Sequence, residues 1–254
     1  MKVLLIGATG NLGLRLVAAL LTHHHTVIAY VRSSHKLESL LPSTTYRQIT
    51  VIEGDAKDPT SIKRAILDSN CEAVVNTAGL AALAPWKSSD LPVIFKAVVS
   101  GIRDASQERG KPLRTWVLGG LGVLHYPGTE TMLSNYIPIY LEHRQNLALL
   151  RSLPANSLDW SMLCPADMTA ESTEFGLPAA SSKGRLIANA GSPPNWHDSW
   201  MRHIPLLGKP IVAGMNATRY ATTLEQAADF IASDVESGES QYFGATVGVI
   251  DPSK

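Results

Sequence analysis

Three glycines at intervals of three residues follow the first apolar run of the chain, and they are the strongest chemical signal in the sequence. The run Val3–Ile6 leads directly into them, and a helical pattern comes next. Such glycines permit a tight turn, let the backbone approach a pyrophosphate and let the helix lie close on the strand, while the helix N-terminus offers amide groups to the anion. The segment therefore predicts a dinucleotide-binding loop, with a glycine turn that binds nothing as the alternative. The residues assigned to the loop are Gly7, Thr9, Gly10, Asn11, Leu12 and Gly13.

The end of the second apolar run carries a basic residue where NAD-binding folds often place an acidic one on the ribose 2′-hydroxyl. Arg32 and Ser33 offer a guanidinium and a hydroxyl. These groups suit a 2′-phosphate and favour NADP over NAD, with a solvated loop arginine as the alternative. Asp55, after the third run, is expected to accept a hydrogen bond from the adenine amino group, with a turn role as the alternative. Residues expected beside the cofactor after later runs are Thr77, Ala78, Gly79, Gly119 and Gly120.

A parallel sheet must position these residues, and the alternation of short apolar runs with helical patterns predicts one. We expect strands at 3–6, 26–31, 47–53, 73–76, 115–118, 160–163 and 242–250. Helices are expected at 11–21, 58–68, 91–109, 136–152 and 223–234. The fold class is a doubly wound parallel α/β sheet of the Rossmann type, in one domain over residues 1–254. Within it we expect a dinucleotide-binding core at 1–165, a small irregular substrate lobe or lid at 166–214, and a helix and strand that return to the core at 215–254.

The composition indicates which partners and which cellular compartment to expect. The chain has 254 residues, with 22 basic and 22 acidic side chains and 45% apolar residues. Zero net charge without a basic stripe argues against nucleic acid or an anionic membrane as the main partner. The longest apolar runs are far too short to span a bilayer, and no signal peptide is evident. Cys71 and Cys164 lie in apolar runs that suit reduced thiols, so we expect a cytoplasmic protein.

No metal site is expected. The run His23–His25 falls between a predicted helix and strand, so it indicates a surface turn, because adjacent side chains do not all point one way. No other group of residues has the spacing of metal ligands.

Several segments together resemble a known family. They are Gly7–Gly13, Val31–Arg32, Gly54–Asp55 and Leu158–Pro165, with a weaker likeness at Thr222–Asp229. They resemble the atypical short-chain dehydrogenase/reductases, specifically the NmrA-like NAD(P)H-binding group. Two branches are most similar: the biliverdin/flavin reductase B-like proteins and the fungal averufin-oxidase-like oxidoreductases of aromatic polyketide pathways in secondary metabolism. The resemblance implies a Rossmann fold and dinucleotide binding.

The catalytic pattern of typical short-chain reductases is incomplete. Those enzymes pair a tyrosine with a lysine four residues later and add a serine after the fifth strand. Here Tyr140 has Arg144 at that spacing, and Leu118–Gly122 contains no hydroxyl. Hydride transfer would need less of an acid if the substrate were a quinone, flavin or conjugated enone, because its product anion is already stabilised.

Two histidines are further catalytic candidates. The resemblance implies a role for His143, because the reductase B-like branch has a histidine at the matching point of its helix. It could donate a proton near neutral pH. The alternative is that His143 is only a polar residue on the flank of a helix. His125 falls in a loop expected at the carboxyl edge of the sheet, where ligands bind, and a loop residue without such a role is equally consistent.

Several aromatic residues suggest a pocket for a flat substrate, although aromatic side chains also pack in cores. The residues assigned to substrate contact are Trp86, Tyr126, Tyr136, Pro165, Trp196 and Trp200. The hypothesis is an NADPH-dependent oxidoreductase that acts on a small aromatic or conjugated carbonyl compound such as a quinone, anthrone, flavin or polyketide. The alternatives are an NmrA-like redox sensor without turnover, and a lyase or isomerase on the same scaffold. Substrate identity, reaction direction and oligomeric state are left open.

Overall fold

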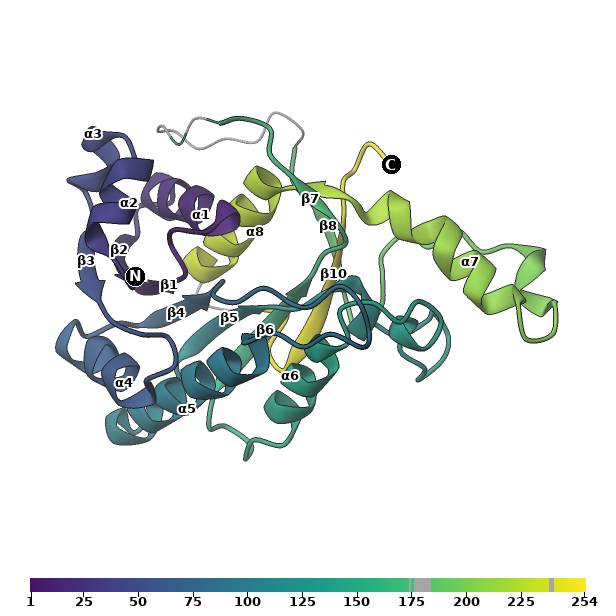
Figure 1. Cartoon of the computed structure of the whole chain (residues 1–254), viewed down its shortest axis with the longest axis horizontal. Coiled ribbons are helices and arrows are strands. Elements are labelled where there is room, and N and C mark those ends of the chain that lie inside the picture. Colours follow the sequence, from purple (N-terminus) through teal and green to yellow (C-terminus); the bar gives the residue numbers. More distant parts are fainter. Residues whose placement is uncertain (174, 176–183, 238–239) are drawn as a thin grey trace.

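An eight-stranded, mostly parallel sheet forms the centre of the molecule (Figure 1). The computed structural model describes residues 1–173, 175, 184–237 and 240–254. The strand order is β3-β2-β1-β4-β5-β6-β10-β8, and every pairing is parallel except that of β10 with β8. The order reverses between β1 and β4, so the predicted doubly wound Rossmann sheet is confirmed. The strands are β1 Lys2–Ile6, β2 Thr26–Val31, β3 Thr50–Glu53, β4 Ala73–Asn76, β5 Arg114–Leu118, β6 Asp159–Cys164, β8 Ile187–Ala190 and β10 Ala245–Ile250.

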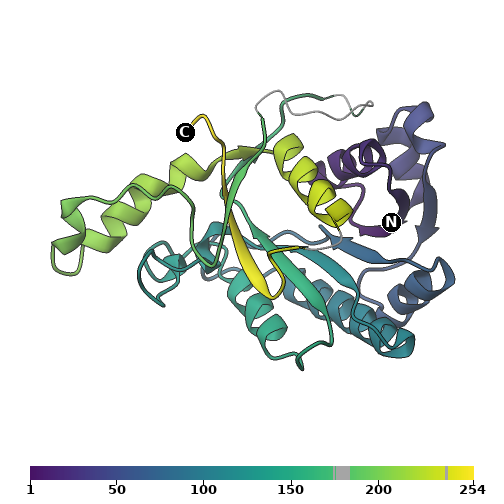
Figure 2. The ribbon, with the colours of Figure 1, turned by 180° about the vertical axis from the view of Figure 1, so that it is seen from behind.

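Helices cover both faces of this sheet (Figures 1 and 2). Alternate residues of β1 show why: Val3 and Leu5 pack toward α1 and α8, whereas Leu4 and Ile6 pack toward α4 and α5. None of the described helices is both long and apolar enough to cross a bilayer. The α-helices are α1 Asn11–Thr22, α2 Ser34–Leu40, α3 Ser43–Tyr46, α4 Pro59–Asp68, α5 Leu91–Arg109, α6 Glu142–Arg151, α7 Gly208–Ala217 and α8 Leu224–Ser237. Short 3-10 helices are η1 Leu121–Val123, η2 Leu133–Asn135, η3 Trp200–His203 and η4 Thr218–Tyr220, and a separate two-stranded ladder joins β7 Met168–Thr169 to β9 Thr222–Thr223.

Most predicted elements are found within a few residues, and two strands are shorter than expected. The strand predicted at 47–53 begins only at Thr50, because residues 43–46 form α3. The strand predicted at 242–250 begins at Ala245, because Gly244 has a φ of 68° and forms a turn before it.

The helix predicted at 136–152 is wrong in its first turn and a half. The helix α6 begins at Glu142, and the residues before it form η2 and an irregular segment. Pro138 explains the difference, because proline lacks an amide donor and restricts the residue before it. Consequently Tyr140 lies outside the helix, with a φ of 52°.

The segment predicted as an irregular lobe is partly regular. Its residues 187–190 form β8, which pairs antiparallel with β10 and extends the main sheet. The helix α7 crosses the predicted boundary between 214 and 215, and it projects to one side of the molecule in both views (Figures 1 and 2). Residues 174 and 176–183 of the predicted lobe lie outside the described part of the chain.

The histidine run is only partly the surface turn that was predicted. His24 is at the turn with a φ of 57°, but His25 is buried and its ring contacts the Ala232 carbonyl oxygen. Partial burial lowers the pKa of His23, yet hydrogen bonds with Asp229 and Glu236 raise it to a net value above the ordinary one. The run therefore fastens α8 to α1. Among the described residues no group of three or more metal-ligating side chains is found.

Candidate functional site

The turn between β1 and α1 has the geometry of an anion-binding loop. Gly7 has a φ of 91°, and the Gly10 amide donates to the Gly7 carbonyl oxygen over 3.0 Å. Gly10 is the N-cap residue of α1, and it makes no side-chain hydrogen bond to the helix. The amide groups of the first helical turn are therefore left for an external acceptor such as a diphosphate.

The three glycines of this turn have different roles. A Cβ atom at Gly13 would lie 2.1 Å from the Gly7 carbonyl oxygen, and one at Gly7 would lie 2.7 Å from the Ala78 amide nitrogen. These two glycines let α1 and the loop after β4 lie close against the end of β1. A Cβ atom at Gly10 would meet only the Gly7 oxygen, at 3.3 Å. The space beside Gly10 is otherwise open, which fits the close approach of a dinucleotide.

The residues predicted to bind the adenosine end lie at the ends of β2 and β3. Arg32 is exposed and makes no ion pair or hydrogen bond within the described structure, while the Ser33 hydroxyl accepts from the Lys36 amide and caps α2. The Glu53 carboxylate accepts from the Ser34 amide over 2.6 Å, which fixes this turn. The Asp55 carboxylate accepts from the Lys57 amide over 2.9 Å, so Asp55 has the turn role that is the alternative to adenine binding.

A cavity of about 520 Å³ continues from the start of α1 along the carboxyl ends of β4, β5 and β6. Its volume lies within the range of small-molecule sites. The wall is largely apolar, and α6 and α7 close it on the far side. The structure brings ten of the predicted site residues to this wall, namely Asn11, Leu12, Thr77, Ala78, Gly79, Gly119, Gly120, Tyr140, His143 and Pro165.

The two glycines after β5 leave room for protein side chains as well as for a ligand. A Cβ atom at Gly119 would lie 2.7 Å from the Met162 side chain, and one at Gly120 would lie 3.1 Å from His143 Cδ2. The absence of a side chain at Gly120 therefore lets the histidine ring lie against the strand end. Cys164 is also close to Gly119, and burial raises the pKa of its thiol to about 12, so this thiol is protonated and a poor nucleophile at neutral pH.

The pKa of His143 does not suit the predicted role as a proton donor near neutral pH. Burial lowers the pKa of its imidazole to about 4, and the neighbouring Glu142 offsets this only in part. The ring is therefore neutral at neutral pH and has no imidazolium proton to give there. Its Nδ1 atom is buried and has no hydrogen-bond partner in the described structure. A neutral imidazole can still donate or accept one hydrogen bond at this atom.

Tyr140 and Arg144 both line the cavity, although they do not share a helix turn as predicted. The φ of 52° at Tyr140 is an uncommon conformation for a bulky residue. Its amide donates to the Leu83 carbonyl oxygen over 3.2 Å, which connects it to the loop after β4.

Glu142, which the sequence analysis did not single out, makes more hydrogen bonds to the loop after β4 than Tyr140 does. Its carboxylate accepts from the Ala82 amide and from the amide and hydroxyl of Ser89 over 2.6–2.8 Å. Burial would raise the pKa of Glu142, but these hydrogen bonds lower it below its ordinary value. The ionised carboxylate thus holds the 79–90 loop against the start of α6.

None of the five aromatic residues assigned to the substrate lines the cavity. Trp86 and Trp200 are 82% and 76% exposed and do not line the cavity. Tyr126, Tyr136 and Trp196 form an edge-to-face cluster instead, with ring centroids 5.2–5.5 Å apart. These three side chains therefore pack against one another, as expected if they belong to the core and do not contact a substrate.

His125 is also outside the cavity wall. Its amide donates to the Gly191 carbonyl oxygen over 2.9 Å, and His125 forms an isolated bridge with Met132. The backbone of His125 therefore connects its own loop with the segments around Met132 and Gly191.

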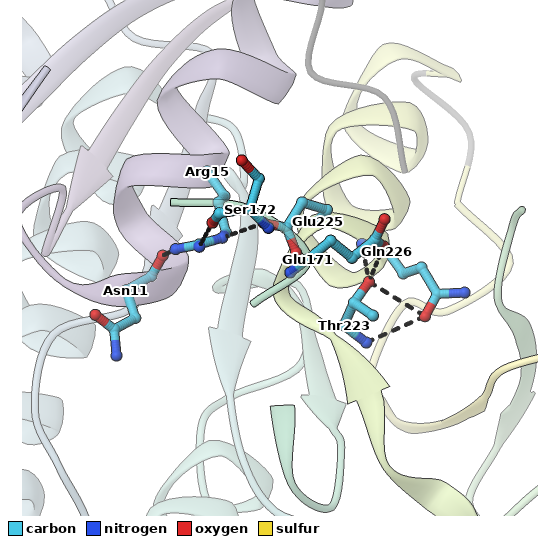
Figure 3. A network of polar contacts seen from close by, with 7 residues as sticks. All are labelled: Asn11, Arg15, Glu171, Ser172, Thr223, Glu225 and Gln226. Carbon is cyan, nitrogen blue, oxygen red and sulfur yellow. Dashed lines mark hydrogen bonds and ion pairs between the residues drawn. The ribbon is translucent and has the colours of Figure 1, made fainter. Parts of the chain in front are cut away.

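A second residue that sequence reasoning missed is Arg15, one turn after the glycine loop (Figure 3). Its guanidinium is buried and donates to the Glu225 carboxylate over 2.5 Å and to the Asn11 carbonyl oxygen over 2.8 Å. A third bond goes to the Ser172 carbonyl oxygen. The network thus ties α1 to α8 and to the segment after β7. A lone arginine among the apolar residues of the first predicted helix is the only local signal of it.

The fold, the uncapped start of α1 and the cavity together define a dinucleotide-binding Rossmann protein. The sequence profile of an NAD(P)H-binding family matches residues 7–190, well over half of the 254-residue chain. The chain therefore belongs to this NAD(P)H-binding family, and its cofactor is a nicotinamide dinucleotide. No curated protein matches the sequence significantly.

Solved structures of bacterial proteins share the fold. One is described as an exported protein of Burkholderia pseudomallei, with a TM-score of 0.63 and 23% identity over 98% of this chain and 99% of that one. Another, assigned as an NADH-flavin reductase of Streptococcus pneumoniae, has a TM-score of 0.63 and 19% identity over 99% of each chain. A wide-type short-chain dehydrogenase/reductase of Veillonella parvula in complex with NADP has a TM-score of 0.61 and 16% identity over 99% of this chain and 94% of that one. At these identities the likeness establishes the fold alone.

Replacing Gly10 by valine tests the phosphate loop. The φ of −84° at Gly10 is open to any residue, so the variant is expected to fold. Its side chain would occupy the open space beside the first amides of α1, and we expect the affinity for NADPH to fall at least about 100-fold. A fluorescence titration measures the affinity, and Gly214→Val, at a position with no atom within 4 Å of its Cβ, is the control. Unchanged affinity in Gly10→Val would refute the assignment.

The pKa of His143 predicts how stability depends on pH. The folded pKa is about 4 and the ordinary value is 6.5, so between these values the unfolded chain binds a proton that the folded chain does not. The free energy of unfolding therefore falls as the pH drops below about 6.5, by roughly 2–3 kcal/mol at pH 4.5. Urea denaturation should show this loss in the wild type and a smaller loss in His143→Gln. Equal losses in both proteins would contradict the neutral, buried imidazole.

Proposed function

We propose that the protein is an NADPH-dependent oxidoreductase that reduces a small aromatic or conjugated carbonyl compound, such as a quinone, flavin or anthrone. The observation that carries the proposal is the cavity itself, which begins at Asn11 and Leu12 of the dinucleotide loop and ends at Tyr140 and His143. A ligand in its far part would lie next to the end of a dinucleotide that follows the strand ends. The largely apolar wall suits a flat, uncharged substrate.

The residues of the cavity favour a substrate that demands little acid catalysis. When bound, NADPH supplies a hydride. Tyr140 is the candidate that can present a hydroxyl proton to the substrate oxygen, and Arg144 lines the same wall. The partly buried, neutral ring of His143 can supply a hydrogen bond but no imidazolium proton at neutral pH. A quinone or flavin matches this arrangement, because delocalisation stabilises the anion that forms on hydride uptake.

The preference for NADPH over NADH is supported by Arg32, an exposed guanidinium at the end of β2 without a partner in the described structure. An arginine can bind the two oxygens of a 2′-phosphate in a bidentate manner. Glu53 lies close enough to bond the Ser34 amide, and its negative charge would oppose a phosphate at the same turn. The preference therefore depends on the balance of two opposite charges.

Exchanging Arg32 for aspartate should move the preference from NADP toward NAD. Loss of a charge-assisted bidentate contact and gain of a like charge should weaken NADP binding by about 100-fold, while NAD binding stays within a few-fold. Isothermal titration calorimetry gives both dissociation constants. Arg151→Asp, on the exposed end of α6, is the charge-matched control. An unaltered ratio of the two constants in Arg32→Asp would remove the proposed role.

Turnover tests the catalytic assignment. We expect wild-type protein to transfer deuterium or hydride from C4-labelled NADPH to at least one member of a panel of quinones, flavins, anthrones and enones. Tyr140→Phe should lower kcat by about 10² to 10⁴ with unchanged affinity for NADPH, because it removes the proton donor. Tyr126→Phe is the control, since the hydroxyl of Tyr126 is buried away from the cavity wall. Full activity of Tyr140→Phe would leave its role without support.

A dinucleotide sensor without turnover is the second candidate function. It is favoured by the absence of a hydroxyl in Leu118–Gly122 and by Arg144 in place of the lysine of typical short-chain reductases. Such a sensor would bind NADPH in the same titration and transfer no label to any compound of the panel. The two measurements together therefore separate the candidates.

A further inference from the structure

The loop after β4 presents a run of apolar residues to the solvent. Residues 79–86 read Gly-Leu-Ala-Ala-Leu-Ala-Pro-Trp, and Lys87 is the first charged residue after them. None of these eight residues is buried, and the side chains of Leu80, Leu83 and Trp86 are 83%, 57% and 82% exposed. Soluble proteins rarely expose a contiguous apolar run of this length unless it binds a ligand or a partner. The run therefore indicates a binding surface.

Hydrogen bonds hold this loop in place, so its leucines cannot turn inward without breaking them. The Glu142 carboxylate accepts from the Ala82 and Ser89 amides. Between these two points, the Leu83 carbonyl oxygen accepts from the Tyr140 amide over 3.2 Å. The backbone thus presents the apolar side chains in a fixed arrangement, and a ligand that covers them does not have to order the loop first.

The exposed apolar surface continues into the cavity. Leu80 lines the cavity wall although it is largely exposed, and Ile139, which is 41% exposed, does the same. Because these two side chains belong both to the wall and to the surface, they mark a mouth of the cavity. Ile139 directly precedes Tyr140, whose amide bonds Leu83, so Leu83 lies beside this mouth and outside the wall. We call Leu80, Leu83 and Ile139 the mouth patch.

The charges around the mouth patch narrow what can cover it. Residues 79–86 and 136–139 contain no charged side chain, and Asp90 at the end of the loop is paired with Lys57 over 2.6 Å. A charged substituent therefore has no counterpart on the patch, whereas a hydrocarbon chain does. A protein partner seated on Leu80 and Ile139 would obstruct the entry of a substrate. A hydrocarbon tail attached to the substrate covers the same side chains while its ring occupies the cavity.

We propose that the substrate carries an apolar tail, and that this tail leaves the cavity over the mouth patch while the ring lies inside. The substrate class is an alkyl- or prenyl-substituted quinone or a related aromatic carbonyl compound. The inference rests on the proposed function, because it takes the ring to be the group that is reduced. Each methylene that is fully buried raises an affinity by up to about fourfold. A substrate with a tail therefore binds much more tightly than the same ring without one.

Two quinones that differ only in the tail test this inference. They are 2,3-dimethyl-1,4-naphthoquinone and the homologue in which an octyl chain replaces one methyl group. Neither compound has a free position on the quinone ring to which a thiol could add. Equilibrium dialysis of the full chain saturated with NADP⁺ measures both dissociation constants without turnover, at concentrations below those at which the octyl compound aggregates. We expect the octyl compound to bind at least about 30-fold more tightly.

Variants of Leu83 show where the tail binds. Leu83→Ser should reduce the advantage of the octyl compound at least about fivefold, while the dissociation constant of the dimethyl compound stays within about twofold. Leu83→Met keeps an apolar side chain and should retain the advantage. Leu207→Ser is the matched control, because Leu207 is 62% exposed, similar to Leu83, and does not line the cavity. This control should also retain the advantage.

The outcomes separate this inference from the proposed function. Loss of the advantage in Leu83→Ser but not in Leu207→Ser supports the mouth patch as the site of the tail. Equal binding of the two quinones by the wild type, or an advantage that Leu83→Ser leaves unchanged, would overturn the inference. Reduction of the dimethyl compound by NADPH would then leave the oxidoreductase intact. Binding of neither quinone would also overturn it, and label transfer to the other compounds of the panel decides the proposed function separately.

Two further results would assign the patch differently. An advantage that falls equally in Leu83→Ser and Leu207→Ser would show adsorption of the tail to apolar surface in general and overturn the inference. Sedimentation velocity measures whether the wild type self-associates. Self-association that Leu83→Ser abolishes, together with an unchanged advantage of the octyl compound, would give the mouth patch to a second copy of the chain.

Discussion

The close approach of α1 to the end of β1 is the constraint on which the site depends. Only the absence of a side chain at Gly13 lets the helix lie within contact of the Gly7 carbonyl oxygen, where a Cβ atom would be 2.1 Å away. A larger residue would push the first turn of α1 off the sheet. The amide groups of that turn would then no longer face the point where the strand order reverses between β1 and β4, and the anion site would be lost although the sheet could remain.

The opposite half of the cavity depends on contacts between segments far apart in the sequence. Glu142 holds the 79–90 loop through three hydrogen bonds, and Arg15 connects α1 with Glu225 of α8 and with Ser172 (Figure 3). At the start of α8, Thr223 and Gln226 bond each other's amide groups reciprocally, which fixes the helix end that carries Glu225. The wall that would meet the substrate is thus set by tertiary contacts, whereas the dinucleotide loop is set by local backbone geometry.

This difference explains what the sequence could predict. The central strands and the glycine loop follow from apolar runs and glycine spacing, which are local, and the structure confirms them as elements. The spacing of apolar residues predicts a helix through Tyr140, but Pro138 lies within that stretch and its restriction of the backbone outweighs the spacing. The partnership of β8 with β10, the burial of His143 and the position of Glu142 depend on segments that meet only in the folded chain. Contacts of this kind cannot be predicted from the spacing of residues in the sequence.

The separation of the dinucleotide loop from the rest of the cavity wall explains how different reactions can occur on this fold. The residues predicted to meet the dinucleotide lie in the first half of the chain, and Gly7 and Gly13 among them are constrained by close backbone approach. Residues that would meet the substrate come from η2, the start of α6 and the face of α7 that carries Ala213 and Ala217. Because these later segments pack on the sheet through side chains, they can change without disturbing the phosphate loop. A chain can therefore share its fold with distant structures and still carry different residues on the part of the cavity that would meet the substrate.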